Sequence, residues 1–143
     1  MRFASAIVIW LAVGAAAAQS STPAGLWKTV NERGEVEGLV RIAEVAGELR
    51  GTVEKVYSPP APNAHPLCLD CTGERKGKPV IGMQILSGLR WDGAQYSGGE
   101  ILDPNNGKSY RCLMRLAEGG RKLEVRGYIG ISLFGRTQVW LRD

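Results

Sequence analysis

The chain has 143 residues, a formal net charge of +4 and a hydrophobic fraction of 44%. This length fits one domain, and the basic residues are spread along the sequence rather than gathered into a patch. These values argue against a large multidomain enzyme, a polytopic membrane protein and a cytosolic nucleic-acid-binding protein.

The first 18 residues have the three parts of a secretory signal peptide. Residues 1–3 carry a positive charge, residues 4–16 are uncharged and mostly apolar, and the alanines at 16–18 form an A-x-A cleavage site. A transmembrane anchor would need about 20 apolar residues, which is more than this run supplies. We therefore predict cleavage after Ala18, a periplasmic or secreted location, and one mature domain over residues 19–143 without a transmembrane segment.

Alternating apolar and polar residues predict short β-strands throughout the mature domain. The expected strands cover residues 25–30, 36–43, 49–54, 81–89, 95–102, 110–116, 123–131 and 135–142, where 81–89 also fits a short helical turn. Glycines within these strands suit the bends of a small barrel. Closure removes the exposed edges of an antiparallel sheet, so the pattern predicts an all-β, up-and-down antiparallel barrel of about eight strands.

Two connections between the expected strands stand out. A hairpin turn is predicted at Asp103, Pro104, Asn105 and Gly107. Proline presets φ there, while asparagine and glycine accept a positive φ. The second connection, residues 58–79, holds five of the seven prolines and two of the three cysteines. We interpret it as a long irregular loop, and loops of this length are often functional.

The three cysteines allow several arrangements. In an oxidising compartment, Cys68 and Cys71 can form a disulfide within the loop, which leaves Cys112 buried on an apolar strand face. Alternatively, one of the loop cysteines bonds to Cys112, and the spacing alone does not decide between these pairings. Two functional alternatives are a thiol–disulfide redox pair and a zinc site formed by His65 with the three cysteines.

The sequence contains few groups suited to catalysis. His65 is the only histidine, and it lies between Ala64 and Pro66 in the irregular loop. The sequence has no G-x-S-x-G motif, no paired acids of the glycosidase type and no phosphate-binding glycine loop. We therefore expect a non-catalytic protein without a cofactor.

The first and last strands carry candidate residues for closing the barrel. These residues are Gly25, Trp27, Arg136, Trp140 and Arg142. The first two form a Gly-x-Trp pattern that resembles the closure of lipocalins. When a barrel closes, an arginine of the last strand can lie over the indole of a first-strand tryptophan. We expect this group to close the barrel rather than to contact a ligand.

Several sequence pieces follow one another in a specific order. They are G-L-W at 25–27, C-x-x-C at 68–71 with K-P-V-I-G-M at 78–83, D-P-N-N-G-K-S-Y at 103–110, L-E-V-R-G-Y-I-G at 123–130 and G-R-T-Q-V-W at 135–140. Together they resemble the domain-of-unknown-function 2147 family of small secreted bacterial proteins. The resemblance implies a lipocalin-like barrel in the Gram-negative envelope or outside the cell, and it implies no activity.

These features predict a secreted or periplasmic binding module. Its ligand would be a small apolar molecule or an envelope component, held in the barrel mouth beside the loop 58–79. A barrel interior filled by its own side chains would instead indicate a structural or protein-interaction role. A thiol–disulfide or zinc-dependent function at Cys68 and Cys71 is the remaining alternative, and nucleic acid is not an expected partner.

Overall fold

The structure is a computed structural model that describes Gly14, residues 22–57 and residues 65–143. The predicted signal peptide, apart from Gly14, and its cleavage site after Ala18 lie outside the described residues. Residues 58–64 of the predicted loop also lie outside them. None of the helices in the described ranges is long and apolar enough to cross a membrane.

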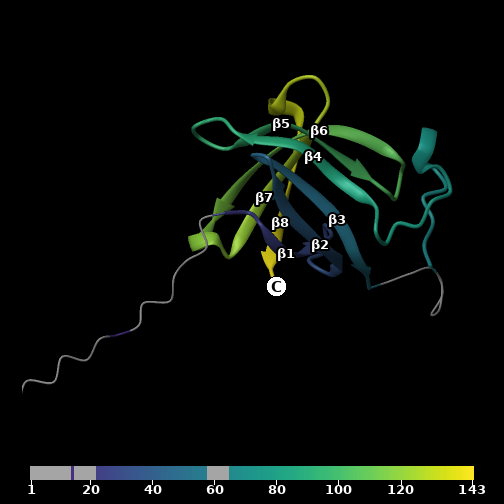
Figure 1. The fold of residues 1–143 in the computed structure, drawn as a ribbon, viewed down its shortest axis with the longest axis horizontal. Coiled ribbons are helices and arrows are strands. Elements are labelled where there is room, and N and C mark those ends of the chain that lie inside the picture. Colours follow the sequence, from purple (N-terminus) through teal and green to yellow (C-terminus); the bar gives the residue numbers. More distant parts are fainter. Residues whose placement is uncertain (1–13, 15–21, 58–64) are drawn as a thin grey trace, which may run out of the picture.

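In the described part of the chain, eight antiparallel strands close into a barrel (Figure 1). They are β1 (Gly25–Val30), β2 (Val36–Val45), β3 (Glu48–Val56), β4 (Gln84–Trp91), β5 (Tyr96–Asp103), β6 (Lys108–Ala117), β7 (Lys122–Tyr128) and β8 (Arg136–Arg142). Each strand pairs with its neighbours in sequence, and β1 also pairs with β8. The predicted all-β, up-and-down barrel is therefore confirmed.

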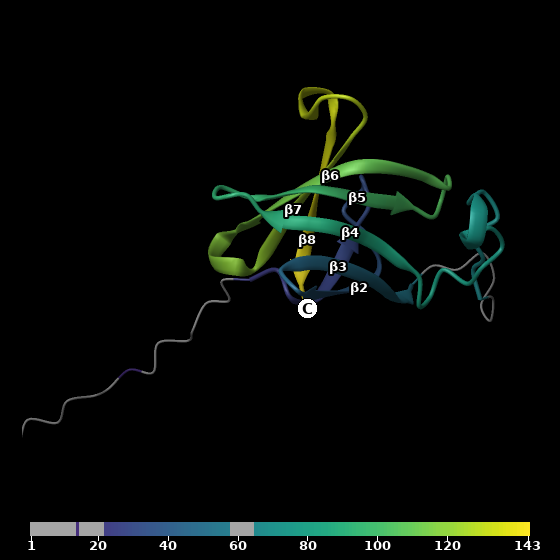
Figure 2. The same ribbon diagram turned by 45° about the horizontal axis from the view of Figure 1, so that its top comes forward.

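Successive strands run in opposite directions, so the connections gather at two ends of the barrel (Figure 2). We call one the closed end; it consists of the segment 22–24 and the turns 46–47, 92–95 and 118–121. We call the other the open end; it consists of the loops 31–35, 57–83, 104–107 and 129–135. Short 3-10 helices lie in three of these connections: η1 (Gly73–Arg75), η2 (Glu118–Gly120) and η3 (Ser132–Phe134).

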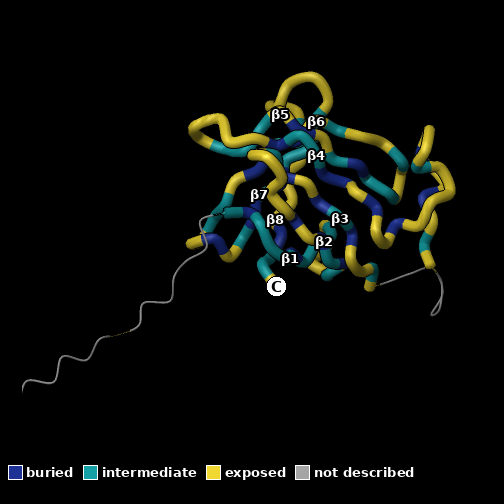
Figure 3. Tube along the Cα trace, viewed as in Figure 1, coloured by how far each residue is buried: buried dark blue, intermediate teal, exposed yellow. Residues whose placement is uncertain are grey.

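The core fills the middle of the barrel and its closed end, and a part of it continues under the loop 57–83, where Cys68, Cys71, Val80 and Met83 are buried. The most deeply buried side chains in the barrel include Trp27, Leu89, Cys112, Met114 and Leu123. They lie on strands, whereas the connections are largely exposed (Figure 3). The inward side chains thus exclude water from one half of the barrel, and their burial is the main stabilising contribution of that half.

Two strand glycines make this close packing possible. A Cβ atom on Gly51 would lie 2.8 Å from Cδ1 of Leu86, and a Cβ atom on Gly99 would overlap the side chain of Leu89. The leucines of β4 thus occupy the space that side chains on β3 and β5 would otherwise need. The glycine-rich composition serves inter-strand packing here as well as turns.

Two of the predicted strand boundaries are wrong. The predicted strand 81–89 begins only at Gln84, and the predicted strand 123–131 ends at Tyr128. Gly130 adopts a φ of +79°, and η3 begins two residues later, so the chain does not continue the β7 ladder. As a result Ile129 and Ile131 leave the strand, and both are exposed.

Candidate functional site

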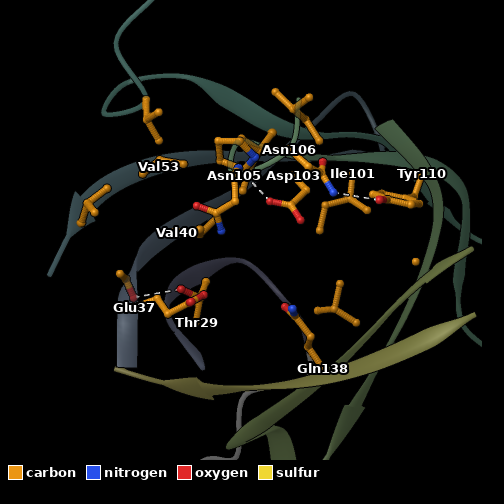
Figure 4. A pocket seen from close by; sticks show the side chains of 18 of the residues that line it. Thr29, Glu37, Val40, Val53, Ile101, Asp103, Asn105, Asn106, Tyr110 and Gln138 are labelled. Carbon is orange, nitrogen blue, oxygen red and sulfur yellow. Dashed lines mark hydrogen bonds between the residues drawn. The ribbon is translucent and has the colours of Figure 1, made fainter. Parts of the chain in front are cut away.

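A cavity of about 1350 Å³ occupies the open end of the barrel. Its wall is formed largely by apolar side chains that point inward from several strands (Figure 4). They include Val40, Val53, Ile85, Ile101, Val125 and Trp140. Most of these side chains are buried, so the apolar wall continues directly from the core below it.

Polar side chains also line this cavity, and several are held in place by hydrogen bonds. The Asn106 amide nitrogen Nδ2 donates to the Tyr110 hydroxyl at 3.0 Å. The Asn105 backbone N–H donates to Oδ1 of Asp103 at 2.9 Å, and Trp140 Nε1 donates to Oε1 of Gln138 at 3.1 Å. A phenol can accept one hydrogen bond and donate another, so the cavity offers oriented polar groups beside an apolar wall.

Gly127 helps to keep the cavity wide. A Cβ atom on this residue would lie 3.5 Å from Ile101 Cγ2 and 3.5 Å from Tyr110 Cβ, which is ordinary van der Waals contact. Position 127 therefore has room for a Cβ atom, and glycine leaves this space empty. Gly127 differs in this respect from Gly51 and Gly99, where the missing side chain is already replaced by leucines.

The predicted hairpin turn forms between β5 and β6, at the edge of the cavity. Gly107 N–H donates to the Asp103 carbonyl at 2.8 Å, while the Asp103 carboxylate caps the turn through Asn105. Asp103, Pro104 and Asn105 were predicted to form a turn only, yet all three line the cavity. The sequence predicts the turn from the backbone preferences of these residues. Their position at the cavity, however, depends on how the barrel closes.

The loop between β3 and β4 lies beside this turn (Figures 1 and 2). It contains a disulfide between Cys68 and Cys71, and Cys112 is a buried free cysteine on β6. The alternative bridge from the loop to Cys112 is therefore absent from the described residues. A Cβ atom on Gly107 would overlap the Asp70 carbonyl oxygen, so the glycine allows loop and turn to meet.

The structure does not assemble the alternative zinc site. Two of its four members, Cys68 and Cys71, are joined in the disulfide, and Cys112 lies in the barrel core. Within the described ranges, no group of three or more histidine, cysteine, aspartate or glutamate side chains is placed to hold a metal ion. His65 lies exposed at the start of the described part of the loop.

The predicted closure residues divide between the two ends. Arg142 lies over the ring of Trp27 with its Cζ atom 4.3 Å from the ring centroid. Its guanidinium donates to the carbonyl oxygens of Gly120 (2.7 Å), Ala24 (3.0 Å) and Thr22 (2.8 Å). Burial lowers the pKa of Arg142. This arginine therefore ties β8 to the N-terminal segment and to the β6–β7 turn across the closed end.

The remaining closure candidates have different positions. Gly25 contacts the closure directly, since a Cβ atom there would lie 2.8 Å from Nη1 of Arg142. In contrast, Arg136 lies at the open end and forms an exposed ion pair with Glu32 at 2.9 Å. Arg136 and Trp140 both line the cavity. Arg136 thus joins β8 to the residues that follow β1 at the open end, away from the group formed by Gly25, Trp27 and Arg142.

Two carboxylates with lowered pKa values lie away from the cavity, at the closed end. Hydrogen bonding from the Gly88 backbone N–H lowers the pKa of Glu48, with a further contribution from Arg50. The backbone N–H groups of Gln95 and Ala94 lower the pKa of Asp92. Both carboxylates accept bonds that organise strands or turns, so their shifted pKa values have structural causes.

Sequence reasoning missed most of the cavity wall. Thr29, Val40, Val53, Tyr110 and Gln138 line the cavity and were not singled out. Their alternation with outward residues predicts that they face inward. The sequence pattern does not show, however, which inward positions meet a packed core and which meet an empty space.

The comparisons with known proteins agree with this architecture. A family described as an uncharacterized protein conserved in bacteria (DUF2147) matches residues 25–142. No curated protein matches the sequence. Among solved structures, the chain is similar to protein HP1028 from Helicobacter pylori, described as belonging to the lipocalin family. That similarity has a TM-score of 0.73 and 19% identity, and it covers 87% of this chain and 84% of the other.

Proposed function

This chain belongs to the DUF2147 family of bacterial proteins, and we propose that it is a non-catalytic module that binds a small, mainly apolar ligand. The observation that carries the proposal is the cavity of about 1350 Å³ at the open end. Binding sites for small molecules are concave and mainly apolar, with a few placed polar groups, and the mouths of β-barrels are frequent positions for them.

The lining of the cavity favours an amphiphile with an apolar tail and a polar head, since neutral polar groups and charged side chains of both signs, such as Glu37, Lys55 and Arg136, accompany the apolar wall. The aliphatic wall around Val40 and Val125 gives a tail a place away from water, which contributes about 25 cal/mol for each Å² of apolar surface buried. Asn105, Asn106 and Tyr110 supply amide and hydroxyl groups to a head. A purely hydrocarbon ligand that displaced water from these neutral groups would offer them no hydrogen bond in return, which disfavours such a ligand.

The two alternative functions have less support. A structural barrel with a filled interior would not need the cavity at the open end. A thiol–disulfide function would need a sulfur atom that a partner can attack, but Cys68 and Cys71 are 0% and 2% exposed. Burial also raises the pKa of the Cys112 thiol to about 12, which disfavours the reactive thiolate.

The proposed location is the periplasm or the exterior of the cell. The signal-peptide pattern of residues 1–18 supports export. A structural disulfide at Cys68–Cys71 is consistent with an oxidising compartment. Intact-mass measurement of protein isolated from the cell envelope tests this: the chain should begin at Gln19, and a mass that retains residues 1–18 would contradict it.

Ligand binding can be tested with N-phenyl-1-naphthylamine, an apolar probe whose fluorescence increases away from water. The protein should bind it saturably, and Gly127→Leu should weaken binding at least tenfold because the new side chain enters the cavity. Val139→Leu, on an exposed position of β8, is the matched control and should bind as the unaltered protein does. Absence of saturable binding, or equal binding by Gly127→Leu, would contradict the proposed function.

The natural ligand can be sought by native mass spectrometry of protein purified from its own envelope. We expect a noncovalent adduct that Gly127→Leu loses and Val139→Leu retains. The same spectrum reports a bound metal ion and the state of the cysteines. A metal adduct in place of an organic one would favour the zinc-dependent alternative.

A further inference from the structure

The loop between β7 and β8 presents apolar side chains to solvent. Its residues 129–135 include no charged residue. Ile129, Ile131, Leu133 and Phe134 are all exposed, and Leu133 and Phe134 are 75% and 78% exposed. In both ribbon views the loop stands out from the barrel (Figures 1 and 2). Such a cluster of exposed apolar side chains is unusual on a small monomer and marks a contact surface.

The loop is held in this shape by the protein itself. Arg126 Nε donates to the Ser132 carbonyl at 2.7 Å, and its Nη2 donates to the Leu133 carbonyl at 3.2 Å. Arg126 Nη1 donates to the Thr137 hydroxyl at 2.8 Å. One guanidinium therefore fixes both the loop and the start of β8, with η3 between them. The apolar side chains are presented outward by an organised backbone.

The same loop forms one side of the cavity mouth. Ile129 and Phe134 line the cavity, as do Leu67 and Leu69 from the loop between β3 and β4. Leu67 and Leu69 are also exposed. The cavity thus opens between two apolar tips that come from segments far apart in the sequence.

A ligand inside the cavity does not account for the whole apolar surface. Ile131 and Leu133 are exposed, and among the described residues they are not part of the cavity lining. Their side chains would remain in water when the cavity is filled. A second, larger apolar partner is needed to cover them.

The shape of this surface favours a lipid bilayer over a protein. A standard protein interface uses about 20 to 30 residues on each side, whereas this surface consists of a few side chains on two projecting loops. A bilayer surface can receive separate projecting tips at the same time, because it has no fixed shape to match. Insertion of residues 129–135 would carry no charge into the membrane interface.

Basic side chains lie next to both tips. Arg126 and Arg136 flank the uncharged loop in sequence, and Arg136 is paired with Glu32 of the neighbouring loop 31–35. The loop with Leu67 and Leu69 contains Arg75, Lys76 and Lys78 against the acidic Asp70 and Glu74. The loop 31–35 at the same end contains one more acidic than basic residue. The attraction to anionic headgroups therefore comes from Arg126 and from the basic cluster at 75–78, which lie beside the two tips.

We propose that the open end docks on an anionic bilayer surface, with Ile131 and Leu133 inserted and the cavity mouth facing the lipid. Docking in this orientation would let an apolar molecule pass between the bilayer and the cavity without crossing water. This transfer step rests on the proposed ligand-binding function, whereas docking itself does not.

Sedimentation with sucrose-loaded vesicles tests the docking. The vesicles contain phosphatidylethanolamine and phosphatidylglycerol at a ratio of three to one. The protein should sediment with them, and the double variant Ile131→Ser/Leu133→Ser should lower the partition coefficient at least tenfold. The matched control is Trp91→Ser, which removes an exposed aromatic side chain from the closed end and should leave partitioning unchanged.

Probe binding without vesicles separates this proposal from the proposed function. The double variant should still bind N-phenyl-1-naphthylamine as the unaltered protein does, since neither side chain lines the cavity; this result also shows that the variant is folded. Vesicle binding without probe binding would support docking and contradict the ligand-binding function. Equal sedimentation of the double variant would overturn docking. So would a protein that does not sediment but self-associates through these residues in sedimentation equilibrium, which would assign the tips to a second copy.

Discussion

The two ends of the barrel are built from the same eight strands but differ in what fills them. At the closed end, Trp27 is fully buried, and Arg142 lies on its ring while binding three backbone carbonyls. At the open end, the inward side chains surround a cavity, and Leu133 and Phe134 face solvent. One end therefore holds the barrel together, which leaves the other end free to remain hollow.

The boundary between the halves can be followed across three strands. Gly99 on β5 pairs with Cys112 on β6, which in turn pairs with Gly127 on β7. At one end of this row, the side chain of Leu89 fills the space beside Gly99. At the other end, Gly127 borders the cavity. Two glycines at the same level of the sheet therefore differ in their surroundings: Gly99 allows close packing, and Gly127 leaves space in the cavity.

The largest expected difference between the ends concerns the aromatic side chains. Trp27→Ala removes the central side chain of the closed end and should lower the free energy of unfolding by about 3–5 kcal/mol. Phe134→Ala, at an exposed open-end position, should change it by less than about 0.5 kcal/mol. Urea unfolding followed by circular dichroism measures both. Similar losses of unfolding free energy in the two variants would contradict the proposed difference in packing between the two ends.

The two arginines of β8 provide the next comparison. Arg142→Ala should cost about 2–3 kcal/mol of unfolding free energy, because it loses charge-assisted hydrogen bonds and the contact with Trp27. Arg136→Ala should cost less than about 1 kcal/mol, because its ion pair with Glu32 is exposed. Arg142→Lys keeps the charge but not the planar fork, and should recover only part of the loss. Equal effects at the two positions would contradict the role assigned to Arg142.

Gly99 and Gly127 allow the two ends to be compared where they meet. Gly99→Ala should destabilise the protein by about 1–3 kcal/mol, because the added methyl group overlaps Leu89. Gly127→Ala should change stability by less than about 0.5 kcal/mol, since its methyl group meets only ordinary contacts. Thermal and urea unfolding of the two variants test this. A loss of stability in Gly127→Ala as large as that in Gly99→Ala would mean that the cavity wall is as tightly packed as the core.

The smallest expected effect is a pH dependence at Cys112, in the middle of the same row. Burial raises the pKa of the thiol from its ordinary value of 9.0 to about 12. The neutral thiol therefore contributes stability that is fully present below about pH 9 and is lost as the pH rises toward 12. Above pH 9 the loss is roughly 1.4 kcal/mol per pH unit.

Unfolding measurements at pH 8 and pH 10, without reductant, isolate the contribution of Cys112. The unaltered protein should lose on the order of 1 kcal/mol more than Cys112→Ala over this interval. The variant serves as the control because all other titrating groups are shared. An identical pH dependence of the two proteins would show that the thiol is not buried as described.

The fold followed from local chemistry, but the cavity did not. Alternation along strands such as 110–116 predicts inward and outward faces from single residues, and Asp103 to Gly107 form a turn through their own backbone preferences. Ile129 and Ile131 continued the alternation and were misplaced, since β7 ends at Tyr128 and η3 follows. The cavity depends on what eight strands leave unfilled when they meet, a property that no local pattern contains.

Entry of ligand at the open end, with the closed end left unchanged, can be tested with three indole N–H signals. Residues 19–143 contain three tryptophans: Trp140 in the cavity wall, Trp27 in the closed-end core and Trp91 exposed at the closed end. Nitrogen–proton NMR during titration with N-phenyl-1-naphthylamine should shift the Trp140 signal saturably and leave those of Trp27 and Trp91 in place. An unmoved Trp140 signal, or a larger shift at Trp27, would contradict the account.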